Sequence, residues 1–254
     1  MAASIVIDAG HGGYDSGASY QGRREKDDVL RLALAVGQKL AQDGYQVYYT
    51  RTEDVYDSPY EKAQIANAAG ADYFVSLHRN SSPNPNTYSG VETLVYQENQ
   101  VVNDIADAVN QRLSEVGFRN LGIKERPGLV VLRRTQMPAV LIEAGFLNTD
   151  ADNALFDQKF NEIADAIAQG IEEGIGAADT SRPARYGVQV GLFSHAANAL
   201  FLQEQLEELG YQVQIRREEP YDAVIVGEET SLEDAAALQN RLRQMGYDTL
   251  IVSL

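Results

Sequence analysis

Short apolar runs alternate with longer segments of helical periodicity through the first two thirds of the chain. The apolar runs, most of them too uniform to leave one face in water, predict strands at 5–8, 46–51, 73–78, 91–96, 129–132 and 139–143. Helical patterns lie between them at 27–43, 60–69, 101–116 and 152–175. This alternation predicts an α/β fold with a mostly parallel central sheet and helices on both faces.

The pattern breaks down after residue 174, where small residues, Pro and Ser predominate. Such a composition is typical of a linker, and we place it at 177–185. The chain is thereby divided into an N-terminal unit at 1–176 and a C-terminal unit at 186–254.

The C-terminal unit contains an internal repeat. Val190-Gly191 and Gly210-Tyr211 recur 36 residues further on as Val226-Gly227 and Gly246-Tyr247. Each copy has the pattern strand, helix, strand, with a glycine between the helix and its second strand. Two copies predict a small α+β domain of βαββαβ order, with both helices on one face of its sheet and the other face open.

Composition narrows the possible functions. The 254 residues are 44% apolar, and 37 Asp and Glu against 21 Lys and Arg give a net charge of −16. A chain this acidic has no basic surface for a phosphate backbone, so we expect no nucleic-acid partner. Cysteine is absent, which excludes disulfides and thiolate ligands and leaves His and carboxylates as the residues for any metal.

We expect no membrane span, because no run approaches the roughly 20 apolar residues that one requires. The first predicted strand begins at Ile5, with no charged and apolar leader before it. Either a leader has been removed, or the protein leaves the cell by another route. Nothing in the sequence indicates an oligomeric state.

Polar residues with reactive side chains follow three of the predicted strands. His11 comes just after the first strand, His78 ends the third, and Glu143 ends the last. Glu25 opens the first long helix, just past a Gly-rich loop. Because ligands of α/β sheets gather at the carboxyl ends of the strands, we expect these four side chains to meet there.

Zinc is the ion that best fits two histidines and one glutamate, since such a set leaves a fourth position for water. A second carboxylate, here Glu143, would then move the proton between water and the leaving group. Each residue also has a simpler explanation. The histidines could be hydrogen-bonded loop residues, Glu25 could favour a helix N-terminus, and Glu143 could pair with Arg133 or Arg134. The spacings of 14, 53 and 65 residues match no short metal motif.

Five segments of the N-terminal unit, taken together and in order, resemble the zinc-dependent N-acetylmuramoyl-L-alanine amidases of bacterial cell walls. These segments are IVIDAGHGGYDSGA, REKDDVLRLA, YYTRT, SLHRN and PAVLIEAGFLNTDADNALF, and the resemblance covers residues 4–175. It implies that His11, Glu25 and His78 bind one Zn²⁺ and that Glu143 is the catalytic glutamate. It implies hydrolysis of the amide between the lactyl group of N-acetylmuramic acid and L-alanine in peptidoglycan.

Two positions near the second histidine bear on substrate contacts. The family usually has a small residue after this histidine, whereas this chain has Arg79, a cation that could alter those contacts. Asn80 could hydrogen-bond the substrate or simply end its strand. The third histidine, His195, lies in the C-terminal unit, and we interpret Ser194-His195 as a helix start rather than as ligands.

The C-terminal unit resembles the SPOR domain, a module that binds peptidoglycan, typically glycan strands without stem peptides. The resemblance covers nearly all of 185–254 and includes YGVQVGLFSHAANALFLQEQLEELGYQVQI. Strand alternation places Gln189 and Gln214 on the face opposite the helices, where amides suit sugar hydroxyls. These glutamines could also be merely solvated.

The sequence therefore predicts a two-domain zinc amidase of the bacterial cell wall or extracellular space, with peptidoglycan as the partner of both units. Two other functions remain open. One is a zinc peptidase that cuts within the stem peptide, and the other is a non-catalytic scaffold that binds peptidoglycan.

Overall fold

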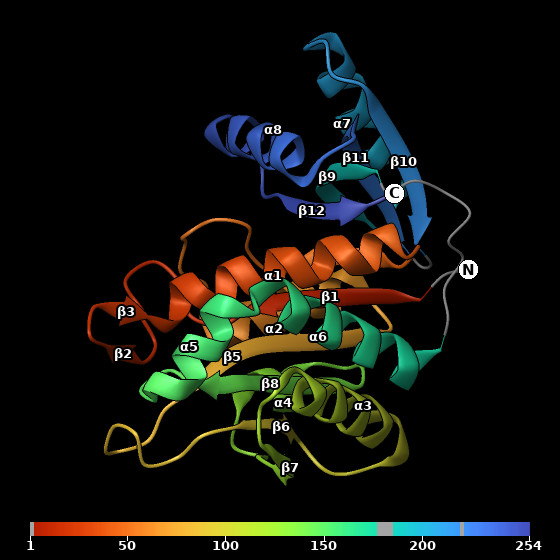
Figure 1. The fold of residues 1–254 in the computed structure, drawn as a ribbon. Helices are drawn as coiled ribbons and strands as arrows, with labels where there is room; N and C mark the ends of the chain where they lie inside the picture. The colour runs from red at the N-terminus through yellow and green to blue at the C-terminus, as the bar shows by residue number, and fades with distance from the viewer. Residues whose placement is uncertain (1–2, 177–184, 219–220) are drawn as a thin grey trace.

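A computed structural model describes residues 3–176, 185–218 and 221–254. The predicted linker, apart from Arg185, lies outside the described residues. Within the described part of the chain, ten strands form one sheet in the order β10-β11-β9-β12-β4-β1-β5-β8-β6-β7 (Figure 1). Among the same residues, no helix is both long and apolar enough to cross a membrane.

The N-terminal unit contributes one half of this sheet. Its strands are β1 (Ser4–Ala9), β4 (Gln46–Tyr49), β5 (Tyr73–Asn80), β6 (Val91–Val95), β7 (Asn120–Glu125) and β8 (Ala139–Phe146). Strands β4, β1, β5 and β8 run parallel, β6 is antiparallel to β8, and β7 is parallel to β6. The predicted α/β fold with a mostly parallel sheet is therefore confirmed. A two-stranded hairpin, β2 (Ser19–Tyr20) and β3 (Arg23–Arg24), precedes the first helix.

Helices cover both faces of this half. The helices are α1 (Glu25–Gln42), α2 (Pro59–Ala69), α3 (Gln100–Val116), α4 (Val130–Arg134), α5 (Asp150–Gln158) and α6 (Phe160–Ile175). The apolar stripes of α1, α3 and α6 share one core cluster with Ile5 and Ile7 of β1. On the opposite face, α2 and α4 pack against Val6 and Phe74. Alternate residues of the buried strands thus fill two separate cores.

The C-terminal unit has the predicted βαββαβ order. Its elements are β9 (Tyr186–Phe193), α7 (Ala196–Glu208), β10 (Val213–Glu218), β11 (Tyr221–Glu229), α8 (Leu232–Gln244) and β12 (Leu250–Ser253). Both helices face the same core, with Leu206 and Leu242 packed among the buried residues of β9 and β11. We call this unit the tail.

The expectation that the other face of the tail is open is wrong for most of that face. Strand β12 pairs with β4 through Val252 and Tyr48, so the tail extends the sheet of the N-terminal unit. Ala223 and Ile225 of the tail are fully buried in the same core cluster as Tyr48. Repeat patterns within the tail carry no information about the neighbour that covers its sheet.

The predicted strand at 129–132 is also wrong, because this segment forms the helix α4. The Arg133 amide donates to the Leu129 carbonyl at 3.0 Å, and Val131 and Leu132 are buried beside α2. Periodicity cannot distinguish a run of four apolar residues in a strand from one buried helical turn.

Two further elements differ from the prediction. The single helix predicted at 152–175 is two helices, because the backbone leaves helical geometry at Lys159. Strand β7 was not predicted. Its sequence, NLGIKE, is mostly polar or half-buried because it lies at the edge of the sheet.

A buried ion pair joins β1 to its neighbours at the carboxyl edge. The Asp8 carboxylate is 1% exposed and accepts hydrogen bonds from Lys62 Nζ at 2.9 Å, Thr50 Oγ1 at 2.6 Å and Ser76 Oγ at 2.6 Å. Burial alone would raise the pKa of Asp8, but the Lys62 ammonium and the two hydroxyls outweigh it and lower the pKa from 3.8 to about 2.

We predict that Asp8→Asn costs about 3–5 kcal/mol of unfolding free energy, because it leaves the Lys62 charge buried without its partner. A carboxyl whose pKa is lowered in the folded state stabilises the fold above its unfolded pKa. The contribution of Asp8 to the unfolding free energy of the wild type should therefore decline by about 2 kcal/mol as the pH falls from 4 to 2.

Urea unfolding from pH 7 to pH 2 measures both effects. Asp72→Asn is the control, because the Asp72 side chain is exposed and bonds Ser4 at the opposite end of β1. Equal stability losses in the two variants would contradict the assigned role of Asp8.

Candidate metal centre at the carboxyl edge of the sheet

The first loop of the chain places His11 at the end of β1 in a strained conformation. His11 has φ of 57°, in the left-handed region that side chains other than glycine seldom adopt. Lys62 Nζ bonds the carbonyl of Ala9 and, at 3.3 Å, that of His11. A pair of backbone hydrogen bonds between Gly12 and Asp15, both at 3.0 Å, closes the loop. These contacts offset the strain and fix the direction of the imidazole.

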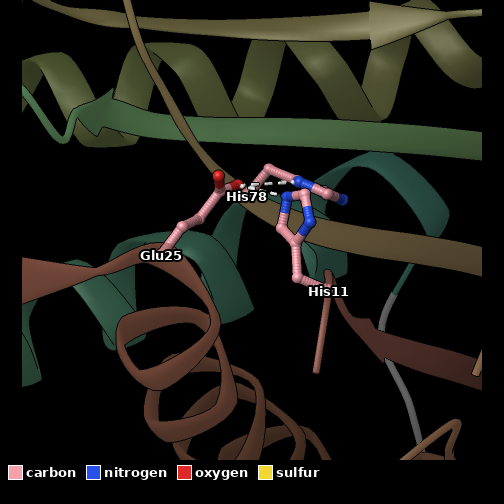
Figure 2. A group of neighbouring side chains, drawn as sticks. All are labelled: His11, Glu25 and His78. Carbon is pink, nitrogen blue, oxygen red and sulfur yellow. Dashed lines mark hydrogen bonds and ion pairs between the residues drawn. The ribbon is translucent and has the colours of Figure 1, made fainter. Parts of the chain in front are cut away.

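Glu25 and His78 come from two other elements and meet His11. Glu25 is the first residue of α1 and only 4% exposed, and His78 lies in the last part of β5. Glu25 Oε1 lies 3.1 Å from His11 Nε2 and 2.9 Å from His78 Nδ1 (Figure 2). One potential ligand atom from each residue lies within 4.8 Å of the other two. Three of the four residues expected to meet are thus brought together.

Glycines allow this close approach. A Cβ at Gly10 would lie 2.3 Å from the His78 ring, and one at Gly17 would lie 2.5 Å from His11 and 2.6 Å from Glu25. The two imidazole rings stand nearly edge to face, with centroids 4.9 Å apart. The Gly-rich sequence after β1 therefore makes room for the side chains of the cluster.

Neighbouring groups orient each member of the cluster. Asp15 Oδ2 lies 2.9 Å from His11 Nδ1, which leaves Nε2 toward Glu25. The second oxygen of Glu25, Oε2, accepts from the Ala18 amide at 2.9 Å, and Oε1 also accepts from the Arg79 amide at 3.1 Å. A carboxylate beside a ligating histidine is the usual partner in metal sites. Asp15 was not predicted, although its place four residues after His11 could have suggested it.

The charges of the cluster favour a cation. Burial alone would lower the pKa of His11, but Glu25 and Asp15 outweigh it and raise the pKa to about 9. Burial would raise the pKa of Glu25, but the two imidazoles hold it well below its ordinary value. A carboxylate kept ionised between two imidazole nitrogens is a donor set that a divalent metal ion fits.

Glu143 lies beside the cluster on the neighbouring strand. It is paired in register with His78, and its Oε2 is enclosed without a hydrogen-bond partner. Burial, reinforced by Glu25 and Glu92, raises the pKa of Glu143 from 4.5 to about 7. A carboxyl that titrates near neutral pH can both accept and donate a proton under working conditions.

The simpler explanation for Glu143, a partner in Arg133 or Arg134, is wrong. Arg133 donates instead to the carbonyls of Pro127 and Gly128, and both arginines are exposed.

Arg79 does not project toward substrate. Its side chain is 1% exposed, donates to Asp28 and Asn153, and lies with its guanidinium 4.1 Å from the centroid of the Phe156 ring. The suggestion that this cation alters substrate contacts is therefore wrong. Its structural effect is to join β5 to α1 and α5.

The remaining predicted positions are Asn80, at the end of β5, and three residues of the tail. The Asn80 amide donates to Glu92 at 2.9 Å, so a substrate contact there stays a prediction. In the tail, Gln214 is exposed, whereas Gln189 is only 8% exposed. Gln189 Oε1 has no partner, and the residue lines a cavity of about 310 Å³ between β9 and α2. His195 occupies the N-cap position of α7 and bonds only locally, to Ser194.

A second cavity of about 310 Å³ opens beside the cluster. His11 and His78 form one part of its lining, and α4 with the segment before it forms another. The lining residues are Asp8, Gly10, His11, Asp15, Asp57, Pro59, Lys62, His78, Gly128, Leu129, Val130, Val131 and Leu141. We call this space the cluster cavity. Both histidines of the cluster therefore border this one cavity.

Comparison with known proteins agrees with this architecture. Residues 5–173 match the N-acetylmuramoyl-L-alanine amidase family, and residues 183–253 match the SPOR domain. The sporulation-specific N-acetylmuramoyl-L-alanine amidase of Bacillus subtilis is 34% identical over 213 residues, which cover 82% of each chain.

Two solved structures resemble the N-terminal unit. The N-acetylmuramoyl-L-alanine amidase of Clostridium difficile 630 is 37% identical, with a TM-score of 0.64 over 67% of this chain and 95% of that one. The catalytic domain of the amidase CwlV from Bacillus (Paenibacillus) polymyxa is 35% identical, with a TM-score of 0.62 over 67% and 97%. The chain therefore belongs to the N-acetylmuramoyl-L-alanine amidase family of cell-wall hydrolases and carries a SPOR domain at its C-terminal side.

Proposed function

We propose that the protein uses one zinc ion, held by His11, Glu25 and His78, to hydrolyse the amide between N-acetylmuramic acid and L-alanine in peptidoglycan. The observation that carries this proposal is the convergence of these three donors within 4.8 Å at the edge of the sheet. Two imidazoles and one carboxylate form a set typical of catalytic zinc sites, which keep one position for water. Such an ion lowers the pKa of a water molecule and polarises a carbonyl oxygen.

Glu143 moves the proton in this proposal. Its pKa of about 7 suits a group that takes a proton from the attacking water and returns it to the nitrogen of the leaving L-alanine. Its Oε2 has no hydrogen-bond partner, so no neighbouring donor would have to be displaced before it accepts a proton. Asp15 keeps His11 oriented, and the Ala18 and Arg79 amides keep Glu25 in place.

The tail, in the same proposal, binds glycan strands. Gln189 and Gln214 both pair in register with Ile225 of β11, so they lie in one row across the sheet. Gln189 has a buried oxygen without a hydrogen-bond partner and lines the cavity beside α2, and Gln214 is exposed. A weak glycan contact raises the local concentration of the bond to be cut, because the second contact becomes intramolecular. In this proposal the protein acts at the cell wall or in the extracellular space.

Glu143→Gln should lower kcat by about 10²- to 10⁴-fold while zinc remains bound, because an amide cannot carry the proton but the three ligands are intact. Release of soluble muropeptides, followed by mass spectrometry, measures hydrolysis and identifies the cleaved bond, and elemental analysis measures zinc. Glu115→Gln, on the exposed face of α3, is the control. A folded Glu143→Gln protein without zinc would contradict the assignment to proton transfer.

His11→Ala should abolish both zinc retention and hydrolysis, because only two donors remain. Treating the wild type with a chelator should have the same effect, and added Zn²⁺ should restore activity to the wild type but not to the variant. Both proteins should still sediment with purified cell walls through the tail. Full activity after removal of zinc would refute the metal-dependent mechanism. Newly exposed amino groups within the stem peptide, rather than on L-alanine, would indicate a peptidase.

Gln214→Ala should weaken sedimentation of the full-length protein with glycan strands that lack stem peptides, while hydrolysis of small soluble muropeptides stays unchanged. Gln205→Ala is the matched control, since Gln205 is an exposed glutamine on α7. If both variants bind glycan as the wild type does, this row of the tail sheet is not the binding surface.

A further inference from the structure

Two tyrosines stand beside the cluster cavity, and no step described above uses them. Tyr14 is 82% exposed, and its ring lies over that of Tyr56, with centroids 4.2 Å apart and planes inclined by 31°. Each tyrosine immediately precedes a residue that lines the cluster cavity, Asp15 in one case and Asp57 in the other. The pair is therefore joined through the chain to the cavity lining, and one of these lining residues, Asp15, bonds His11.

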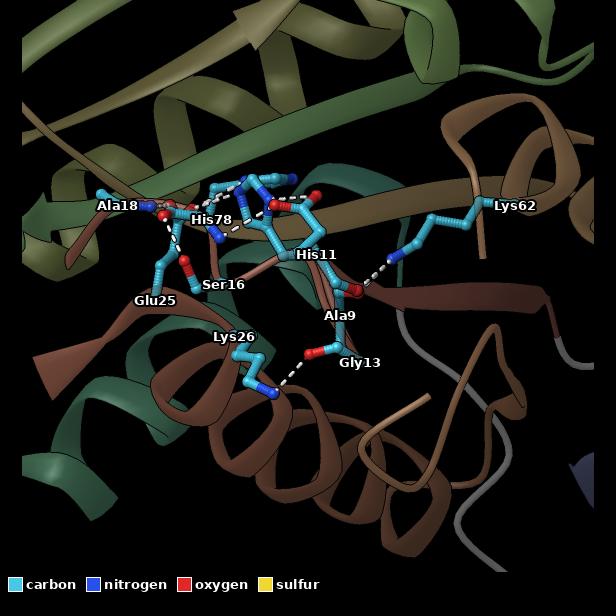
Figure 3. Close-up of polar contacts among 12 residues, drawn as sticks. Ala9, His11, Gly13, Ser16, Ala18, Glu25, Lys26, Lys62 and His78 are labelled. Atoms are coloured by element: carbon cyan, nitrogen blue, oxygen red, sulfur yellow. Dashed lines mark hydrogen bonds and ion pairs between the residues drawn. The ribbon is translucent and has the colours of Figure 1, made fainter. Parts of the chain in front are cut away.

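The loop that carries Tyr14 is held in one conformation. The Gly13 amide donates to Asp54 Oδ1 at 2.8 Å, and Lys26 Nζ donates to the Gly13 carbonyl at 2.6 Å (Figure 3). A Cβ at Gly13 would lie 2.8 Å from the Tyr56 amide nitrogen, so the two loops are in direct contact. A large aromatic ring is thus exposed on a fixed support, so the protein would lose little conformational entropy when a ligand binds to it.

We propose that Tyr14 and Tyr56 form the subsite for the sugar ring of the substrate, the N-acylated hexose to which the lactyl group is attached. This inference rests on the proposed function. A sugar ring presents a face of C–H groups, and the face of an aromatic ring, with its negative quadrupole, is a suitable surface for it. Because the scissile amide lies only a few bonds from the sugar, the subsite must adjoin the cluster, as this pair does.

Charge distinguishes the sugar from the peptide side of the substrate. Asp15 and Asp57 lie next to the tyrosine pair, and their negative charge disfavours the carboxylates of a stem peptide but tolerates a neutral sugar. Another part of the lining comes from α4 and the segment before it, and these two segments also carry the exposed arginines Arg126, Arg133 and Arg134. Arg133 folds back to the Gly128 carbonyl at 3.3 Å, at the lining of the cavity. The sugar therefore lies toward Tyr14 and the anionic peptide toward α4.

Two substrates with the same scissile amide test this subsite. One is N-acetylmuramoyl tripeptide, and the other is the corresponding D-lactoyl tripeptide, which lacks the sugar. We expect the wild type to prefer the first. Tyr14→Ala should lower kcat/KM for the sugar substrate about tenfold and leave the lactoyl substrate unchanged. Tyr14→Phe should retain the preference, because the ring rather than the hydroxyl makes the contact.

Inhibition by the free tripeptide supplies a second measurement. Its inhibition constant should be equal in the wild type and in Tyr14→Ala, because the peptide does not touch the pair. Tyr96→Ala is the control, since Tyr96 is 44% exposed and follows β6 at the opposite edge of the sheet. It should behave as the wild type.

A tenfold loss on both substrates, or a weaker inhibition by the tripeptide, would show that Tyr14 only supports the loop and would overturn the subsite. An unchanged kcat/KM on the sugar substrate would overturn it as well. If the zinc-loaded wild type hydrolyses neither substrate, the proposed function itself fails, and this result is distinct from the other two.

Discussion

The buried pair of Asp8 and Lys62 is the interaction on which the rest of the site depends. It joins β1 to α2, and through Thr50 and Ser76 it also joins β1 to both neighbouring strands. The same ammonium bonds the carbonyls of Ala9 and His11, so the charge that neutralises the carboxylate also fixes the strained loop. An exposed ion pair could not do this, because solvent would screen it and its side chains would remain mobile.

A second set of contacts supports the same loop from the other side. The Arg51 guanidinium, on a side chain that is almost wholly buried, donates to the carbonyls of Ala9, Gly10 and Lys26. Lys26 in turn follows Glu25 directly, so one cation joins the chain around His11 to the first turn of α1. Two members of the cluster, His11 and Glu25, come from different elements and are thereby held at a fixed separation. A metal site requires such fixed positions of its donor atoms.

The fold of the N-terminal unit could be predicted from the sequence, because parallel strands that are buried on both faces consist of consecutive apolar residues. The four site residues could be located because α/β sheets collect reactive side chains at one edge. The predictions that failed concern two short elements. Residues 129–132 are as apolar as a strand but make one helical turn, and β7 is too polar to stand out. The supporting residues Asp15, Lys62 and Arg51 were not predicted, since only the folded loop shows what their charges face.

The shared sheet has a mechanical consequence. Val252 of β12 pairs with Tyr48 of β4, Ser253 Oγ accepts from the Val47 amide at 2.5 Å, and Gln239 bonds Thr52, the residue after Arg51. A tail attached in this way is not a loose tether. Given the glycan binding proposed for it, the tail would hold the candidate metal centre at a fixed distance from the glycan strand that it binds. Each bound molecule would then cut at a constant distance from that strand, and not at any bond that a flexible linker could reach.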